Sequence, residues 1–307
     1  MPQICGRFAP SPSGELHLGS LLAAVGSYLA AHCMGGRWRL RIDDLDLPRV
    51  VPGAADAILR SLQAHGLQWD GDVLYQSQRG DAYRAALEQL RCAGLTYRCA
   101  CTRRELAAIA RAGIDGPVYP GTCRDGPAPG RPARALRLRV PDAEIGFHDA
   151  VQGDCRHNLA GAVGDFVLQR ADGQIAYQLA VVVDDAFQRI TQVVRGVDLL
   201  ASTPRQIYLQ QCLDLPQPSY AHLPLLVDSH GLKLGKQTGA GPLDDTRASD
   251  NLRQVLTALA LPPPCDLHGA PPTELLHWAT AHWEPARLAG QAAVRIQTPP
   301  PAGTPLR

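Results

Sequence analysis

Lysine is almost missing from this chain of 307 residues. Lysine and arginine together number 30, and only positions 233 and 236 hold lysine, so arginine carries nearly all of the positive charge. The formal net charge is +1, which gives no global sign of nucleic-acid binding. Any contact with RNA would therefore depend on a local basic patch.

Long apolar runs are also missing. No stretch approaches the ~18 uninterrupted apolar residues that a membrane helix needs, so we expect no membrane contact. The first expected strand begins a few residues after Met1, which leaves no room for a signal peptide and predicts a cytoplasmic protein. The cysteines number 9, and without an export signal they favour reduced thiols or a metal site over disulfides.

One stretch near the N-terminus predicts a strand, a tight loop and the start of a helix. Residues 3–8 are mostly apolar and suit a buried strand, whereas the prolines and glycine that follow exclude regular structure. Residues 16–31 predict a buried helix that begins near Gly19 and places His17 and Ser20 at its N-terminus. Free N–H groups and the positive end of the helix dipole favour phosphate there. The alternative is that Ser20 only caps the helix and His17 is incidental.

The two lysines lie three positions apart in a glycine-rich polar loop between Gly231 and Gly239. A compact, mobile ammonium can follow a transferring phosphoryl group as its charge shifts, which a planar guanidinium does less well. The alternative is that the two lysines occur here by chance, but their position in one loop favours a common role.

Strands alternate with helices through the first part of the chain. A strand expected over 37–42 ends in a carboxylate cluster that includes Asp43, and open α/β sheets bind ligands at that edge. Helices expected over 53–65 and 79–93 flank a short strand at 73–75. This alternation predicts an α/β fold with a parallel, doubly wound sheet.

The pattern changes at residue 97. Cys99 and Cys101 precede a helix expected over 102–112, and Cys123 follows it. Three cysteines at this spacing suit a small tetrahedral zinc site, and three buried core cysteines are the alternative. Strands expected over 136–140, 145–151, 165–170 and 175–178 complete a small mixed insertion.

Arginines heavily outnumber acidic residues between positions 91 and 139. Phosphate binding is the simplest use of such a patch, and a solvated surface face is the alternative. Farther along, the chain predicts helices over 179–186, 205–213, 250–261 and 273–282, and strands over 189–194 and 220–223.

Taken in order, these motifs resemble the class I aminoacyl-tRNA synthetases. Residues 7–20 resemble their "HIGH" signature, and residues 233–237 resemble their "KMSKS" loop. Within the glutamyl branch, the chain most resembles the short glutamyl-Q tRNA(Asp) synthetase family over residues 3 to about 238. The further matching motifs are Gly6–Gly14 (GRFAPSPSG), His17–Ser20 (HLGS), Arg41–Asp46 (RIDDLD), Tyr177–Asp185 (YQLAVVVDD) and Val194–Leu200 (VRGVDLL).

The resemblance implies a Rossmann-like nucleotide-binding fold in two halves, over 1–96 and 176–240. Between them it implies an inserted α+β subdomain over 97–175, which contains zinc and resembles an acceptor-stem domain. A short helical region over 241–298 and a frayed tail over 299–307 complete the expected organisation.

The resemblance also implies an activity and its residues. The family activates L-glutamate with ATP to glutamyl-adenylate and transfers it to the queuosine base of tRNA(Asp). The residues carried over are His17 and Lys236 for catalysis; His17, Gly19, Ser20, Lys233 and Lys236 for ATP; Arg7, Phe8, Ala9, Pro10, Ser11, Asp43, Tyr177 and Arg195 for glutamate; and Cys99, Cys101, Tyr119 and Cys123 for one structural zinc. Mg²⁺ is expected with ATP, and a monomer is the default expectation.

Two departures from the family pattern matter, at positions 43 and 235. Asp43 stands where the family usually has glutamate, so its direct contact with the substrate is in doubt. Gly235 replaces the serine of the lysine loop, and Ser20 replaces a second histidine as in the short family. Only short helices are expected after the lysine loop, so the chain is not expected to read tRNA(Glu) in the usual way. The remaining alternatives are a truncated glutamyl-tRNA synthetase, a small-molecule adenylyltransferase and a non-catalytic RNA-binding module.

Overall fold

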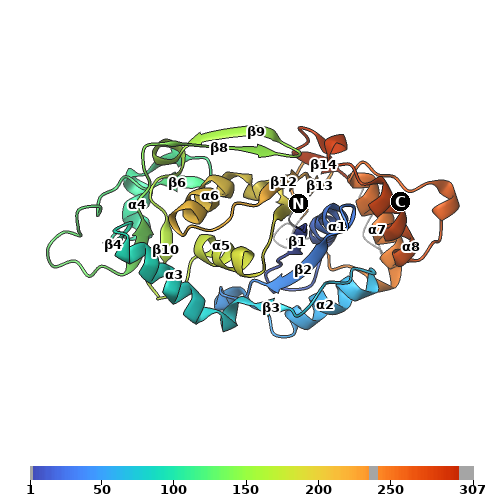
Figure 1. Cartoon of the computed structure of the whole chain (residues 1–307), viewed down its shortest axis with the longest axis horizontal. Helices are drawn as coiled ribbons and strands as arrows, with labels where there is room; N and C mark the ends of the chain where they lie inside the picture. The colour runs from blue at the N-terminus through green and yellow to red at the C-terminus, as the bar shows by residue number, and fades with distance from the viewer. Residues whose placement is uncertain (1–2, 235–240, 297–307) are drawn as a thin grey trace, which may run out of the picture.

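The computed structural model describes residues 3–234 and 241–296. The molecule is elongated, with the inserted region at one end and the C-terminal helices at the other (Figure 1). The central strands lie between these ends, so both outer parts flank the sheet that positions the candidate site.

The central strands are parallel, as the alternating pattern predicts. Strands β1 (Cys5–Phe8), β2 (Arg37–Ile42) and β3 (Leu74–Tyr75) form one ladder, and β11 (Gln192–Gly196) pairs with β12 (Ser219–Leu223) in another. The two ladders meet where the Thr191 amide donates to the Cys5 carbonyl at 2.9 Å. The carboxyl ends of β1 and β11 therefore lie at the same edge.

The two faces of β2 differ sharply because its side chains alternate. Trp38, Leu40 and Ile42 are fully buried in the core that helix α1 (Leu18–His32) and helix α2 (Ala54–Ala64) complete. The arginines of β2 occupy the other face, below helix α5 (Tyr177–Phe187), and Arg41 pairs there with Asp185 of that helix. One strand thus contributes both to the apolar core and to a charged layer.

The C-terminal helices share the core of α1. Leu256 of helix α7 (Ala248–Ala258) and Leu275 of helix α8 (Pro272–His282) are fully buried in the same cluster as Leu21. Strand β13 (Leu225–Val227), which follows β12, pairs in parallel with β14 (Ala293–Arg295). The C-terminal region is therefore anchored to α1 and to the strand that follows β12.

The inserted region is built from short antiparallel pieces. Its elements are the sheet of β4 (Thr96–Cys99), β7 (Ala135–Leu138) and β10 (Val167–Gln169), the hairpin of β5 (Arg111–Gly113) and β6 (Gly116–Val118), the hairpin of β8 (Glu144–Asp149) and β9 (Gly153–Asn158), and helix α4 (Arg103–Ile109). Strand β8 also joins β12 at the pair Asp149–Tyr220. Helices α3 (Gly80–Cys92) and α6 (Thr203–Cys212) pack with this region in a second buried apolar cluster, which includes Leu90, Leu168 and Ile207.

The structure corrects three expectations. The helix expected over 102–112 ends at Ile109, because the next residues pair with β6 in a hairpin. The strand expected over 175–178 is wrong, since Tyr177 begins helix α5 and a four-residue alternation cannot separate these states. Strand β9 is polar and carried no signal, so its hairpin was missed. None of the helices in the described ranges is long and apolar enough to cross a bilayer.

Candidate active site

A cavity of about 470 Å³ lies at the carboxyl ends of β1 and β11. Its walls come from the loop after β1, the N-terminus of α1, the segment after β11 and the start of the lysine loop. The predicted residues that line it are Phe8, Pro10, Ser11, His17, Gly19, Ser20 and Lys233. Ala9 belongs to the same loop but lines neither this cavity nor the adjoining one.

The N-terminus of α1 is closed by a reciprocal cap. Nδ1 of His17 accepts from the Ser20 amide at 3.2 Å, and the Ser20 hydroxyl accepts from the His17 amide at 2.8 Å. An accepting Nδ1 fixes the imidazole tautomer with its proton on Nε2, which is the form that can donate to a phosphate oxygen. Ser20 is thus a genuine cap, and His17 is oriented by it.

The lysine loop approaches this helix terminus closely. A Cβ atom on Gly19 would lie 2.9 Å from the Leu234 carbonyl oxygen, so glycine permits the contact. Lys233 Nζ meets Asp198 Oδ2 at 2.7 Å across the same cavity. The two distant motifs therefore face one cavity. Lys236, the second predicted catalytic residue, lies outside the described residues.

A buried charge network underlies the floor of the site. Arg7 Nε donates to Asp185 at 3.2 Å, and Arg41 donates to Asp185 at 2.6 Å and to Asp43 at 2.7 Å. Burial raises the pKa of Asp43 to about 6 although Arg41 opposes the shift. Arg41 therefore holds the Asp43 carboxylate in place.

Arg195 lies in a second buried relay. Its Nε donates to Nε2 of His222 at 3.0 Å, and Nδ1 of His222 contacts Asp149 Oδ2 at 2.6 Å. An Nε2 that accepts requires Nδ1 to carry the proton, so Asp149 fixes the tautomer that receives Arg195. Arg195 Nη2 donates to Thr203 at 3.0 Å, whereas its buried Nη1 has no partner in the described part of the chain.

A smaller cavity of about 200 Å³ adjoins the first. Ser11 lines both cavities, and Asp43 and Tyr177 line the smaller one. Tyr177 is the first residue of α5 and is 39% exposed, so its ring can contact a ligand. The predicted glutamate residues thus divide between two adjoining cavities and the buried layer beneath them.

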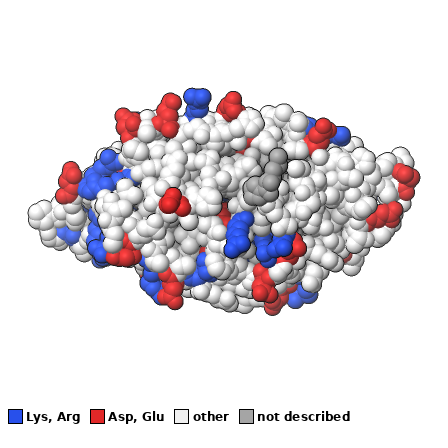
Figure 2. Space-filling view, in the orientation of Figure 1, with Lys and Arg blue, Asp and Glu red and all other residues white. Residues whose placement is uncertain are grey.

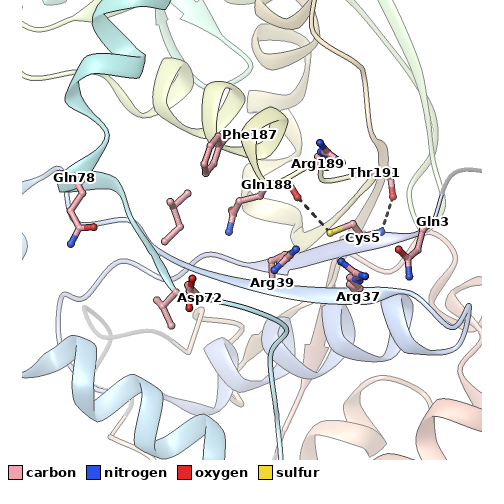
Figure 3. A pocket seen from close by; sticks show the side chains of 12 residues that line it. Gln3, Cys5, Arg37, Arg39, Asp72, Gln78, Phe187, Gln188, Arg189 and Thr191 are labelled. Carbon is pink, nitrogen blue, oxygen red and sulfur yellow. Dashed lines mark hydrogen bonds between the residues drawn. The ribbon is translucent and has the colours of Figure 1, made fainter.

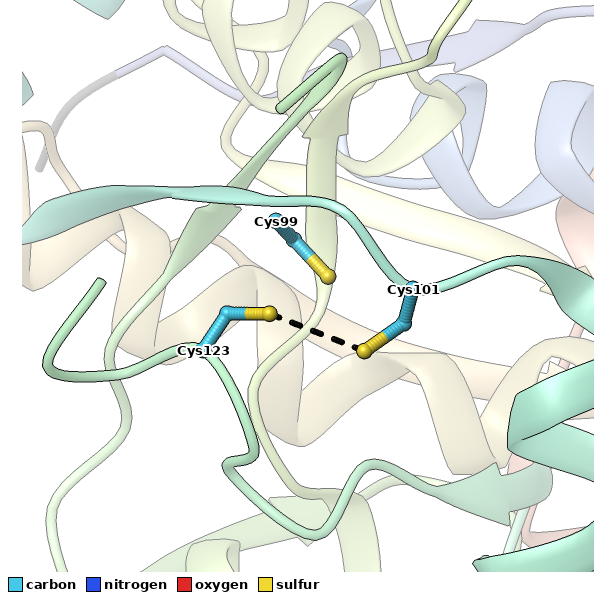
Figure 4. A group of neighbouring side chains, drawn as sticks. All are labelled: Cys99, Cys101 and Cys123. Carbon is cyan, nitrogen blue, oxygen red and sulfur yellow. Dashed lines mark hydrogen bonds between the residues drawn. The ribbon is translucent and has the colours of Figure 1, made fainter. Parts of the chain in front are cut away.

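Three cysteine sulfurs in the insertion lie within 4.8 Å of one another (Figure 4). The Cys101 and Cys123 sulfurs are 3.6 Å apart, close to the ~3.8 Å expected between thiolates around a tetrahedral metal. The Tyr119 hydroxyl lies 3.4 Å from Cys99 and 3.5 Å from Cys101. This set of donors could hold a metal ion, with the tyrosine in the position of a fourth ligand.

The arginines of the insertion divide into two groups. Several are used within the protein: Arg124 pairs with Asp165 at 2.6 Å, and Arg137 stacks on the Tyr119 ring at 3.9 Å. Others are exposed and form no ion pair within the described ranges, namely Arg98, Arg103, Arg104 and Arg134. Figure 2 shows basic atoms at this end of the molecule with acidic ones between them. The basic patch is therefore smaller than the sequence suggests.

Sequence reasoning missed several residues of the site. Arg41 and Asp185 stand inside recognised motifs but were not given a role, and their pairing joins residues 144 positions apart. Asp149 and His222 carried no local signal, because one lies in the insertion and the other in β12. Only their convergence on Arg195 shows what they do.

A parallel sheet whose carboxyl edge meets a helix N-terminus and a lysine loop defines a class I synthetase type of nucleotide site. Residues 3–261 match the family described as tRNA synthetases class I (E and Q), catalytic domain. A curated relative from Thiobacillus denitrificans, named glutamyl-Q tRNA(Asp) synthetase, is 58% identical over 92% of this chain and 94% of its own length. A relative of the same name from Neisseria meningitidis serogroup A is 54% identical over 96% of this chain and 99% of its own.

Solved structures agree with these matches. A glutamate tRNA ligase from Elizabethkingia meningosepticum, in complex with its amino acid, is 29% identical with a TM-score of 0.66 over 81% of this chain. The chain spans about half of that ligase, 53% of its length. A glutamate-tRNA synthetase from Elizabethkingia anophelis shares the fold with a TM-score of 0.78 at 24% identity, over 96% of this chain and 68% of its own. The chain belongs to the class I tRNA synthetases of the E and Q type and, within them, to the glutamyl-Q tRNA(Asp) synthetase family.

Proposed function

We propose that the protein is a cytoplasmic, monomeric ligase that activates L-glutamate with ATP and transfers it to the queuosine base of tRNA(Asp). The observation that carries the proposal is the shared cavity between the N-terminus of α1 and the lysine loop, with Arg7 and Arg195 close by. The names of relatives up to 58% identical support the particular acceptor.

In the first step the α-carboxylate of glutamate attacks the α-phosphorus of ATP in line. The new P–O bond forms as the bond to the β-phosphate oxygen breaks, and pyrophosphate leaves. Such a reaction needs positioning and charge stabilisation rather than a protein nucleophile. Mg²⁺ bound to ATP would neutralise part of the phosphate charge.

The residues of the cavity fit these tasks. His17 presents Nε2–H at the helix N-terminus, and Lys233 lines the same cavity as a source of positive charge for the phosphates. Lys236, outside the described residues, is assigned to the same task. Arg195, whose Nη1 has no hydrogen-bond partner among residues 3–234 and 241–296, is suited to the side-chain carboxylate of glutamate. Asp43 is the candidate anion for the α-ammonium group, and Tyr177 orients the substrate from the adjoining cavity.

The cysteine cluster supports a structural role for zinc. Cys99, Cys101, Cys123 and Tyr119 would hold one ion, and its chemistry there would be to crosslink the start of the insertion. The site lies in the insertion rather than at the catalytic cavity, so the ion has no part in the reaction steps.

Two assays test the function. Glutamate-dependent ATP–pyrophosphate exchange should be present in the wild type and fall at least about 100-fold in Lys236→Ala with the fold intact. Glutamate transfer should occur to tRNA(Asp) that bears queuosine, and neither to tRNA(Asp) without it nor to tRNA(Glu). Exchange without transfer to either tRNA would favour the small-molecule adenylyltransferase. Charging of tRNA(Glu) would favour the truncated synthetase, and no exchange at all would contradict the proposal.

A further inference from the structure

A larger cavity lies on the edge of the sheet opposite the candidate active site. Its volume is about 780 Å³, and it is lined by the amino-terminal ends of β1 and β2 and by the end of α5. Figure 3 shows Arg37 and Arg39 on the sheet side of this hollow, with Gln188 and Arg189 on the side of α5. The proposed reaction uses none of these four residues.

The cavity exposes one end of a row of arginines. The two-residue period of β2 places Arg37, Arg39 and Arg41 on the same face. The inner member, Arg41, is neutralised by Asp43 at 2.7 Å and Asp185 at 2.6 Å. These carboxylates therefore offset the positive charge at the catalytic end of the face, but not the charge at its outer end, at Arg37 and Arg39.

The outer guanidinium groups form no ion pair with a carboxylate in the described part of the chain. Arg37 and Arg189 make no ion pair among the described residues, and both are exposed. Arg39 is half-buried and donates from Nη1 to the Asp70 carbonyl at 2.8 Å. Its buried Nε has no hydrogen-bond partner in the part of the chain that the structure describes. A partly buried guanidinium without a counter-charge is costly, and an anion in the cavity would offset that charge.

The described lining supplies one carboxylate against three guanidinium groups. Burial raises the pKa of the Cys5 thiol, which keeps it neutral although Arg39 opposes the shift. Asp72 is the carboxylate of the lining, against the guanidinium groups of Arg37, Arg39 and Arg189. The hollow thus has an excess of positive charge, and its volume lies within the ~300–1,000 Å³ range of ligand pockets.

We propose that this cavity is a phosphate-binding site, with Arg37, Arg39 and Arg189 donating to the phosphate oxygens from two sides. Planar guanidinium forks match phosphate, and several of them approaching from different elements suit its tetrahedral oxygens. Phe187 at the rim is 60% exposed, and the Arg79 guanidinium lies over one face of its ring, 3.8 Å from the centroid. A base can stack on the other face, so the cavity fits a nucleotide unit better than a bare ion. The phosphate can come from the backbone of an RNA or from a free phosphorylated molecule.

Binding measurements on the full chain test this site without any reaction. The variant is Arg37→Gln/Arg189→Gln, which removes two exposed charges. Arg84→Gln/Arg287→Gln is the matched control, because those arginines are also exposed and lie outside the cavity. The probes are tRNA(Asp) and inorganic phosphate, titrated separately by calorimetry. Phosphate that binds at the candidate active site contributes equally to the variant and the control, so the difference between them reports on the second cavity.

The expected result is a loss of at least about tenfold in affinity for one or both probes in the variant relative to the control. A loss of affinity for tRNA alone identifies an RNA backbone as the ligand. The slope of log K against log salt concentration should then be smaller in magnitude by about one to two. A loss for inorganic phosphate alone identifies a small phosphorylated molecule. Arg39→Gln, measured in the same way, should reproduce the loss.

Equal affinities in variant and control for both probes would overturn the proposal. So would a parallel fall in glutamate-dependent exchange, because the arginines would then act on the catalytic site itself. These outcomes are independent of the proposed function, since binding is measured whether or not glutamate is transferred.

Discussion

Replacing Asp149 with asparagine should weaken glutamate binding although residue 149 lies outside both catalytic cavities. One oxygen of Asp149 accepts the backbone N–H groups of residues 151, 152 and 222 at 2.9–3.1 Å, and an amide oxygen can keep these bonds. The other oxygen faces Nδ1 of His222 at 2.6 Å. An amide NH₂ there forces the imidazole proton to Nε2, where it meets the Nε–H of Arg195.

The magnitude follows from that donor–donor contact. Arg195 Nε loses its acceptor at 3.0 Å, and a hydrogen bond from a charged group contributes about 1.5–3 kcal/mol. If the displaced guanidinium no longer meets the substrate carboxylate, KM for glutamate rises roughly 10- to 100-fold. KM for ATP should stay unchanged, because the residues proposed to hold the phosphates are His17 and the lysine loop rather than Arg195. ATP–pyrophosphate exchange at varied glutamate and ATP measures both constants.

The control is Asp165→Asn, which removes another buried carboxylate of the insertion, one that pairs with Arg124 and not with His222. It should cost stability without moving KM for glutamate. In Asp149→Asn/His222→Gln, an amide oxygen at position 222 can accept from Arg195 without Asp149, and part of the glutamate affinity should return. An Asp149→Asn enzyme with unchanged KM for glutamate, or with both KM values raised equally, would refute the positioning role.

Three further predictions concern the helix terminus, a titrating carboxylate and the cysteine cluster. Gly19→Ala places a Cβ 2.9 Å from the Leu234 carbonyl and should lower exchange about 10- to 100-fold with an unchanged melting temperature; wild-type exchange would show that this approach is dispensable. Burial raises the pKa of Asp43 from 3.8 to about 6, so KM for glutamate should rise as pH falls below about 6, and Asp43→Asn should flatten that profile. The raised pKa also links folding to pH, because the folded state binds this proton more tightly than the unfolded state. The resulting stabilisation is fully present below pH 3.8, is lost as pH rises through about 6, and is absent at neutral pH. Purified protein should carry about one zinc that Cys101→Ser loses and the exposed-thiol control Cys265→Ser keeps; a folded wild type without metal would exclude the site.

The local parts of the site could be predicted because short sequence signals determine them. Proline and glycine after a five- or six-residue apolar run mark a strand, a loop and a helix start, and α1 begins at Leu18 where the pattern placed it. The strand over 37–42 was predicted with its observed bounds, because three apolar residues alternate with three arginines. Cys99, Cys101 and Cys123 converge as their spacing indicates.

The connections between segments could not be predicted in the same way. The Arg41–Asp185 pair joins a strand to a helix that follows the whole insertion, and no local period links them. The relay from Asp149 through His222 exists because β8 of the insertion pairs with β12. Strand pairing across such distances depends on tertiary packing, which composition and spacing do not encode.

The relay favours an acidic substrate at the proposed glutamate site. Burial lowers the pKa of His222, so the imidazole that accepts from Arg195 is neutral. The other acceptors of Arg195 are the Leu199 carbonyl and the Thr203 hydroxyl. Arg195 is therefore a buried cation whose contacts are all uncharged, and one of its nitrogens has no acceptor among the described residues. A carboxylate supplies the missing charge and the missing acceptor together. The amide of glutamine would supply only the acceptor, so its binding would leave the cost of the buried charge in place.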